Sequence, residues 1–161
     1  MIDTKNLIWF DIDKAKQIPK KLNKWLLEDS SLTYKLKQKY PDFRVKVVNE
    51  VEKTPYDNEI PLLNISNNTN VIIRKVLLFG NSKAVVFARS IIPKTKDTKR
   101  FNNIGSKPLG EILFDTKDII RTSIELCHNS EDIWGRRSIF KVNNTNILVS
   151  EFFLDNLFDS K

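Results

Sequence analysis

The chain of 161 residues contains only one cysteine, Cys127, and one histidine, His128. A single cysteine excludes a disulfide within the chain and a metal site built from several thiolates. A single histidine excludes any mechanism that needs two imidazole groups. The sequence also lacks a glycine-rich phosphate loop and a serine–histidine–aspartate order. We therefore expect no metal and no cofactor, with any catalysis resting on positioning and electrostatics.

Long apolar runs are missing as well. The first run, 7–10, is followed at once by Asp11 and Asp13, whereas a secretory signal needs a basic start and an apolar run of roughly 7–15 residues. No stretch approaches the roughly 18 apolar residues that span a bilayer. From these features we expect a soluble protein without stable membrane insertion, which works where it is made.

Basic residues are in excess, but arginine is scarce. The formal net charge is +7, and the 27 basic residues are 20 lysines and 7 arginines. One interpretation is an anionic partner such as nucleic acid, a membrane surface or a small carboxylate. The other is codon usage in an AT-rich genome, which also accounts for 16 Asn and 18 Ile. Because nucleic-acid binders favour arginine for bidentate phosphate contacts, we prefer codon usage and expect no nucleic-acid partner.

Apolar spacing predicts helices near the start and in the middle of the chain. Residues 18–40 indicate two helices with a polar break, and Ser30 or Ser31 is the expected N-cap of the second. Residues 108–114 indicate a short helix or turn. The segments 53–70 and 93–106 are expected to be loops, because both are rich in polar residues.

The rest of the chain favours β-strands. In the first of them, Phe43, Val45, Val47 and Val51 share the odd parity, which places them on one face. Turn residues at 80–82 and 143–145 predict two hairpins, and hairpins imply antiparallel pairing. The sequence therefore predicts one domain over 1–161, with an α+β fold and a single six-stranded antiparallel sheet. The expected strands are 43–51, 71–79, 83–92, 119–126, 136–142 and 146–153.

Two charged residues interrupt apolar strand faces. Arg74 shares its parity with three aliphatic residues of 71–79, and Glu151 shares its parity with three apolar residues of 146–153. A buried charge is costly unless it is paired. One interpretation is that these two residues pair with each other or lie on solvated faces. The other is a pocket over the sheet, where the guanidinium binds a carboxylate and the carboxylate binds a hydroxyl.

Six sequence blocks then follow one another along the chain. They are W-L-L with S-L-T (25–33), R with L-L (74–78), A-R-S-I-I-P (88–93), K-P-L-G-x-x-L-F (107–114), W-G-R-R-S (134–138) and S-E-F-F-L (150–154). In this order and spacing they resemble the chorismate lyase (chorismate pyruvate-lyase) family over about residues 18–154. The composition, which is typical of an AT-rich genome, makes this resemblance more specific. The chain is most similar to the plastid-encoded members of red algae and their relatives. We therefore expect it in the plastid stroma if it is encoded in the organelle, and otherwise in the cytoplasm. The resemblance further suggests that its product supplies plastoquinone synthesis.

The resemblance implies a six-stranded antiparallel sheet with helical flaps that enclose an internal ligand pocket. It also implies the cofactor-free conversion of chorismate to 4-hydroxybenzoate and pyruvate. Arg74 would hold the ring carboxylate, and Glu151 would bind the ring hydroxyl. Leu32 and Leu109 would contribute backbone groups from the two flaps. Lys75 departs from the acidic residue typical of bacterial members, but it falls on the opposite strand face.

Several alternatives stay open. Arg89 and Arg137 are candidates for contact with the pyruvyl carboxylate of the substrate, or they serve in packing. The same fold serves as the effector-sensing domain of some bacterial transcription regulators, so a non-catalytic ligand-binding module is the alternative function. A basic RNA-associated protein is a second alternative, with the loop at 94–100 as its candidate surface. We expect a monomer whose ligands are chorismate and 4-hydroxybenzoate.

Overall fold

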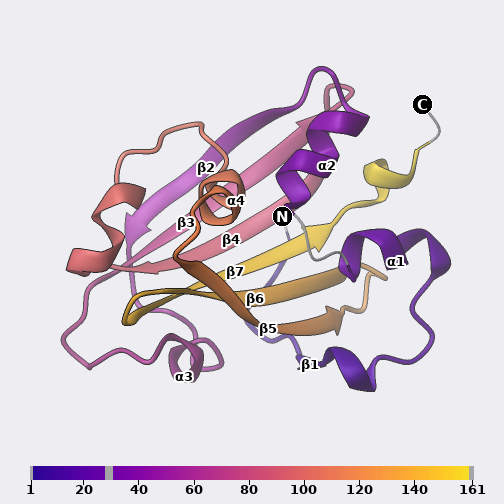
Figure 1. Ribbon diagram of the computed structural model, residues 1–161. Helices are drawn as coiled ribbons and strands as arrows, with labels where there is room; N and C mark the ends of the chain where they lie inside the picture. Colours follow the sequence, from indigo (N-terminus) through magenta and orange to yellow (C-terminus); the bar gives the residue numbers. More distant parts are fainter. Residues whose placement is uncertain (1, 28–30, 160–161) are drawn as a thin grey trace.

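The computed structural model describes residues 2–27 and 31–159, which form one antiparallel sheet with helices packed against it (Figure 1). The strands are β1 Phe10–Asp11, β2 Arg44–Glu52, β3 Val71–Gly80, β4 Lys83–Pro93, β5 Ile119–His128, β6 Trp134–Val142 and β7 Thr145–Phe153. Their order in the sheet is β1-β5-β6-β7-β4-β3-β2. The α+β class and the single antiparallel sheet are confirmed. The predicted number of six strands is wrong, because these residues form seven.

The additional strand is β1. It pairs Phe10 with Leu126 and Asp11 with Glu125 along the outer edge of β5. A 3-10 helix, η1 (Ile12–Lys14), follows directly. Two residues are too few to show the period-two alternation by which a strand is recognised in a sequence. Pairing with a distant partner, rather than local pattern, therefore defines this strand.

The last strand of the chain lies in the middle of the sheet. β7 pairs with β6 on one side and with β4 on the other. The two predicted hairpins, β3–β4 and β6–β7, are both present. Asn81 and Ser82 have φ values of 52° and 60°, as the tight hairpin turn requires. Because β7 joins the two hairpins, only β4 separates Arg74 on β3 from Glu151 on β7.

The two helices expected within 18–40 are confirmed. The Ser31 side chain caps the second one by accepting a hydrogen bond from the Tyr34 backbone N–H at 3.3 Å, whereas Ser30 lies outside the described residues. Within the described part of the chain, no helix combines the length and the apolar content that crossing a membrane requires. The remaining elements are α1 Lys20–Leu26, α2 Leu32–Lys39, α3 Ile60–Leu63, η2 Lys96–Phe101, α4 Leu109–Asp115 and η3 Asp155–Phe158.

Strand β2 departs from the predicted alternation. Its register against β3 shifts between Val47 and Asn49, which is the signature of a β-bulge with one extra residue. Beyond the bulge, Glu50 lies directly opposite Arg74. Val51, which parity placed on the apolar face, is instead 43% exposed. The prediction for Val51 is wrong because a single inserted residue exchanges the two faces of a strand.

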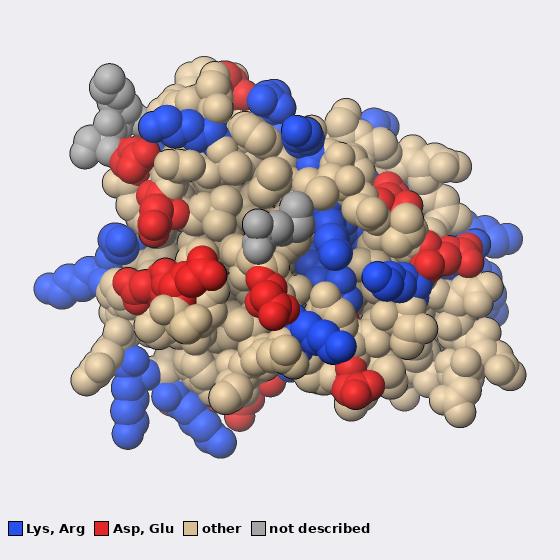
Figure 2. All heavy atoms as spheres, turned by 180° about the vertical axis from the view of Figure 1, so that it is seen from behind, with Lys and Arg blue, Asp and Glu red and all other residues tan. Residues whose placement is uncertain are grey.

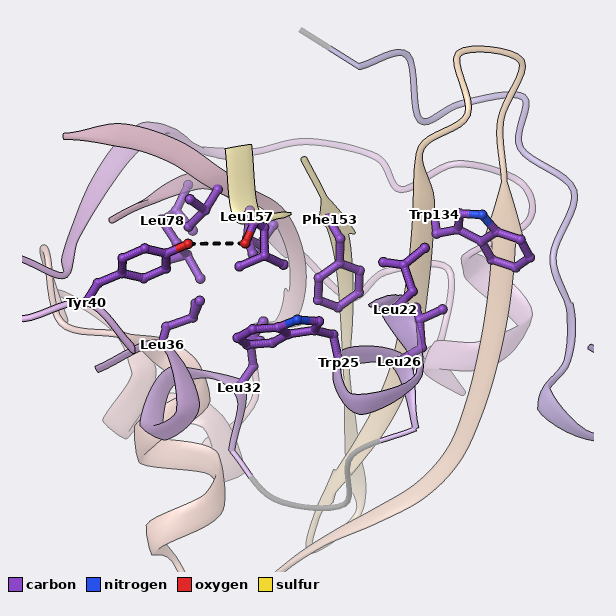
Figure 3. Packing of buried hydrophobic residues seen from close by; sticks show 14 of the residues in the cluster. Leu22, Trp25, Leu26, Leu32, Leu36, Tyr40, Leu78, Trp134, Phe153 and Leu157 are labelled. Atoms are coloured by element: carbon purple, nitrogen blue, oxygen red, sulfur yellow. Dashed lines mark hydrogen bonds between the residues drawn. The ribbon is translucent and has the colours of Figure 1, made fainter. Parts of the chain in front are cut away.

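Helices α2 and α4 lie together over one face of the sheet, in front of it in Figure 1. The core below α1 and α2 is apolar and joins both helices to β7 (Figure 3). The Tyr40 ring, at the end of α2, packs on Gly80, where a Cβ would lie 2.3 Å from the ring. Only glycine permits that approach. The central members of this cluster are Trp25, Leu26, Leu32, Leu36 and Phe153.

The opposite face of the sheet carries a second apolar cluster, in which Trp9 packs against Phe87, Cys127 and Phe152. On the molecular surface seen from behind, acidic and basic side chains of the described residues are intermixed (Figure 2). An RNA-associated protein would need a continuous basic face. The surface in this view is instead typical of solvated charges of both signs.

Candidate active site

A small cavity of about 40 Å³ lies between the sheet and two helical segments, which we call the flaps. The first flap is α1 with α2, and the second is α4 with the preceding residues from 107. Aliphatic side chains of β2, β3, β4 and β7 form most of the floor and walls, together with Arg74, Ser90 and Glu151. Thr33, Leu109 and Gly110 close the cavity from the flaps. The cavity thus combines apolar walls with two charged groups.

A larger and more open cleft, of about 480 Å³, borders residues 52–55 and 65–71. Its charged side chains, Glu52 and Lys53, are exposed to solvent. Exposed charges are well hydrated and exert weak forces on a ligand. The small cavity is the better candidate for chemistry because its charges are desolvated.

Arg74 reaches the cavity from β3, and its side chain is only 2% exposed. Nη1 donates a hydrogen bond to Oε2 of Glu50 at 3.1 Å, and Nη2 donates to the carbonyl oxygen of Lys107 at 3.0 Å. A guanidinium carries five N–H donors in a planar fork. Two of the five make these contacts, one from each terminal nitrogen of the guanidinium.

Glu151 reaches the cavity from β7, where it lies opposite Ala88 of β4. Its Oε1 accepts a hydrogen bond from Nε of Arg136 at 2.8 Å. Arg136 is 1% exposed and also donates through Nη1 to the carbonyl oxygen of Trp25 at 2.9 Å. Arg136 therefore compensates the charge of Glu151 and connects it to the end of α1.

The alternative in which Arg74 and Glu151 pair with each other is not observed. Among the described residues, each has a partner of its own, Glu50 for the arginine and Arg136 for the carboxylate. With β4 between them and neighbouring strands ~4.8 Å apart, the two backbones are separated by about 10 Å. The site therefore has a cationic end and an anionic end. This arrangement suits a flat ring with a carboxylate at one end and a hydroxyl at the other.

The two flap residues expected at the site differ in position. Leu109 is the first residue of α4 and lines the cavity. The Leu32 side chain packs near Trp25 in the flap core (Figure 3), and its neighbour Thr33 lines the cavity instead. The flaps meet closely here, because a Cβ at Gly110 would lie 3.3 Å from Oγ1 of Thr33. The expected backbone contacts of Leu32 and Leu109 with a ligand stay predictions.

Arg89 and Arg137 lie away from the cavity. The Nε and Nη2 groups of Arg89 donate to the two carboxylate oxygens of Glu59 at 2.9 and 2.8 Å. Arg137 donates through Nε to Glu125 at 2.9 Å and through Nη1 to the side-chain oxygen of Asn58 at 2.8 Å. Strand alternation points both arginines to the opposite face from their neighbours Ala88 and Arg136. The structure therefore favours a packing role for both.

The single cysteine and the single histidine are also remote from the cavity. Burial raises the pKa of the Cys127 thiol to about 12, so the thiol stays protonated and unreactive at neutral pH. His128 is exposed, stacks on Trp134 and bonds through Nε2 to Oδ1 of Asp132 at 2.6 Å. Residues 2–27 and 31–159 contain no group of three or more metal-ligating side chains placed to hold an ion.

Two members of the charge network, Glu50 and Arg136, were not assigned a role from the sequence, although contact of Arg136 with the substrate was left open. Glu50 was hidden because the bulge in β2 changes its face, and a bulge has no reliable sequence signal. Arg136 stands beside Arg137 in the W-G-R-R-S block, but parity alone does not tell which of the two faces the cavity. The strand register against β7 decides it, since Arg136 lies directly opposite Glu151.

Comparison with known proteins shows to which family the chain belongs. Residues 3–161 match the sequence model of chorismate lyase. The chain belongs to the chorismate lyase family. Proteins of this family named probable chorismate pyruvate-lyase include one from Thiobacillus denitrificans, which is 33% identical over 87% of this chain and 86% of its own. Another, from Shewanella sp. strain MR-4, is 36% identical over 91% of this chain and 85% of its own.

Solved structures with low sequence identity share the fold of this chorismate lyase family member. PhnF from Mycobacterium smegmatis aligns with a TM-score of 0.59 at 10% identity, over 83% of this chain and 67% of that chain. Its effector domain alone gives a TM-score of 0.58 at 10% identity, over 79% and 90% respectively. At such identities the likeness concerns the fold alone, and function has to be argued from the site.

Proposed function

We propose that this member of the chorismate lyase family converts chorismate to 4-hydroxybenzoate and pyruvate. The observation that carries the proposal is that two oppositely charged side chains, Arg74 of β3 and Glu151 of β7, line one largely apolar cavity from either side of β4. A guanidinium binds a carboxylate bidentately, and a carboxylate accepts a hydrogen bond from a hydroxyl. The bacterial relatives named probable chorismate pyruvate-lyase support the same reaction.

The reaction breaks the ether C–O bond between the ring and the enolpyruvyl group. It also removes the hydrogen from the adjacent ring carbon that bears the hydroxyl, so that the ring becomes aromatic. In a concerted route this hydrogen moves to the enol methylene as the C–O bond breaks, and pyruvate leaves directly. In a stepwise route a base takes the proton, enolpyruvate leaves, and its methylene is protonated afterwards. Aromatisation drives both routes.

Under this proposal the protein has to position the substrate and stabilise charge. Arg74 anchors the ring carboxylate, and Glu151 orients the ring through its hydroxyl. Leu32 and Leu109 contribute backbone groups from the flaps. Correct positioning alone is worth up to roughly 7–11 kcal/mol of the activation barrier, so the concerted route does not call for a further catalytic group.

Substrate entry requires the flaps to separate. A cavity of about 40 Å³ is far smaller than the roughly 300–1,000 Å³ typical of sites for small molecules. The flaps are joined by an ion pair of 2.6 Å between Lys37 of α2 and Glu111 of α4, and both side chains are more than 40% exposed. Exposed pairs contribute only about 0–1 kcal/mol, so this one opposes opening weakly. We propose that the flaps open for chorismate and then enclose it in an internal pocket.

One assay tests the proposed reaction. Purified protein is incubated with chorismate and a chelator, and 4-hydroxybenzoate and pyruvate are quantified by chromatography against a protein-free control. We expect equal amounts of both products, formed at a rate proportional to protein concentration. If the protein bound 4-hydroxybenzoate but released no product at high concentration, the lyase proposal would be wrong. The non-catalytic ligand-binding module would then be the better description.

We further propose that the protein works as a monomer in a plastid stroma, where its product supplies plastoquinone synthesis. The support is the joint richness in Lys, Asn and Ile, which indicates an AT-rich genome. Fractionation of cells and detection of the chain in the stroma tests the location. Light scattering during size-exclusion chromatography tests the oligomeric state, and a mass of two chains would contradict it.

A further inference from the structure

Arg74 already has a carboxylate partner within the protein. Glu50 lies directly opposite it on the edge strand β2, and the two side chains are joined by the bond of 3.1 Å between Nη1 and Oε2. The bulge in β2 is what brings this carboxylate to the cavity face of the sheet. Glu50 therefore offers Arg74 the same functional group that the ring carboxylate of a ligand would offer.

The two partners differ in their access to water. The Arg74 side chain is 2% exposed, whereas that of Glu50 is 27% exposed. Glu50 also borders an open cleft of about 710 Å³ outside β2, together with Asn103 and Gly105. If the pair separates, the Glu50 carboxylate can be hydrated in this cleft. The buried guanidinium has no such access to solvent, so it needs a new anionic partner.

We propose that Glu50 is an internal competitor for Arg74, which holds the guanidinium while the site is empty and yields it to the carboxylate of the ligand. This inference deepens the proposed function and rests on it, because it requires Arg74 to be the carboxylate anchor. Glu50 is then a positioning residue that acts through Arg74 and does not touch the reacting atoms. Its effect is to weaken binding of carboxylate ligands and to promote release of the product.

The competition predicts that removing the charge of Glu50 strengthens ligand binding. The test variant is Glu50→Gln, which keeps the shape and a hydrogen-bond acceptor. The matched control is Glu52→Gln, because Glu52 lies two residues along β2 and forms its ion pair with Lys94 at 2.5 Å. Titration calorimetry measures the Kd for 4-hydroxybenzoate and for 4-hydroxybenzamide, which has the same shape without the charge.

We expect Glu50→Gln to bind 4-hydroxybenzoate about tenfold more tightly than the wild type, since a charge-assisted hydrogen bond is roughly twice as strong as a neutral one. Binding of 4-hydroxybenzamide should be unchanged, and Glu52→Gln should match the wild type with both ligands. In turnover, Glu50→Gln should show a lower KM for chorismate and stronger inhibition by 4-hydroxybenzoate. A residue that merely supports the position of Arg74 would move these quantities in the opposite direction.

Equal or weaker binding of 4-hydroxybenzoate by a folded Glu50→Gln variant would overturn the inference. If this variant does not fold, Glu50→Ala replaces it, and the competition predicts the same sign of effect. Failure of the proposed function looks different, because the wild type would then not bind 4-hydroxybenzoate, or Arg74→Ala would bind it equally well. Either of these results would overturn the proposed anchor and the competition together.

Discussion

Replacing Arg74 by alanine should abolish most of the lyase activity while the chain stays folded. The change removes the guanidinium at the cationic end of the cavity, together with its bonds to Glu50 and to the carbonyl oxygen of Lys107. A substrate carboxylate bound bidentately would lose two hydrogen bonds to a charged group. The size of the loss in kcat/KM follows from the free energy that those two hydrogen bonds contribute.

Each hydrogen bond to a charged group is worth about 1.5–3 kcal/mol, so two give about 3–6 kcal/mol. Since each 1.36 kcal/mol is a factor of ten, kcat/KM should fall by about 10²–10⁴. The effect on folding is smaller, because Glu50 is 27% exposed and can be hydrated. We expect a loss of about 2 kcal/mol for the two internal bonds. For a chain of this size that lowers Tm by about 4–8 °C.

The assay is the formation of 4-hydroxybenzoate from chorismate, with Tm measured on the same samples. Lys75→Ala is the matched control, because Lys75 is the next residue of β3 and points to the opposite face of the sheet. It should leave kcat/KM unchanged. If folded Arg74→Ala retained kcat/KM within about threefold of the wild type, well under the factor expected from one such bond, the anchor role of Arg74 would be refuted.

Three further changes test other parts of the site. Glu151→Gln removes the negative charge that we propose orients the ring hydroxyl, so kcat/KM should fall at least about tenfold, and full activity would contradict this role. Lys37→Glu should loosen the flaps by repelling Glu111, and adding Glu111→Lys should restore their contact, with a change of about 0.5 kcal/mol in the free energy of flap opening. Hydrogen exchange of α2 and α4 measures this free energy, and additive effects of the two substitutions would exclude coupling between the two side chains. Because burial raises the pKa of Cys127 to about 12, iodoacetamide should label it in denaturant only, and rapid labelling of the native protein would contradict its burial.

The parts of the fold that depend on neighbouring residues were predictable. The turn at Asn81 and Ser82 fixes the β3–β4 hairpin, because both residues tolerate positive φ. The Ser31 cap and the apolar face of α2 likewise lie within a few residues of each other. Parity alone placed Arg74 and Glu151 among apolar neighbours, and both line the cavity. The turn, the helix cap and the strand alternation each depend on residues that lie close together in the chain.

The parts that depend on distant partners were not predictable from one sequence. β7 pairs with β4 as well as β6, and nothing in its own residues specifies the second neighbour. β1 exists only because β5 offers a free edge to Phe10 and Asp11. The partner of Arg74 was missed for a related reason, since the bulge that turns Glu50 toward it is stabilised by the register with β3. The pairing of strands across the sheet determines these neighbours and this partner.

Two of the buried arginines, Arg74 and Arg136, connect the site to the flaps that cover it. Arg74 holds Glu50 and the carbonyl oxygen of Lys107 in the second flap, and Arg136 holds Glu151 and the carbonyl oxygen of Trp25 in the first. A guanidinium is planar and rigid, so it cannot turn toward a new carboxylate and keep both existing bonds in their present geometry. Exchange of Glu50 for a ligand therefore acts on the bond to Lys107 as well. Under the proposed exchange, occupancy of the cationic end and the position of the second flap would be coupled through this one side chain.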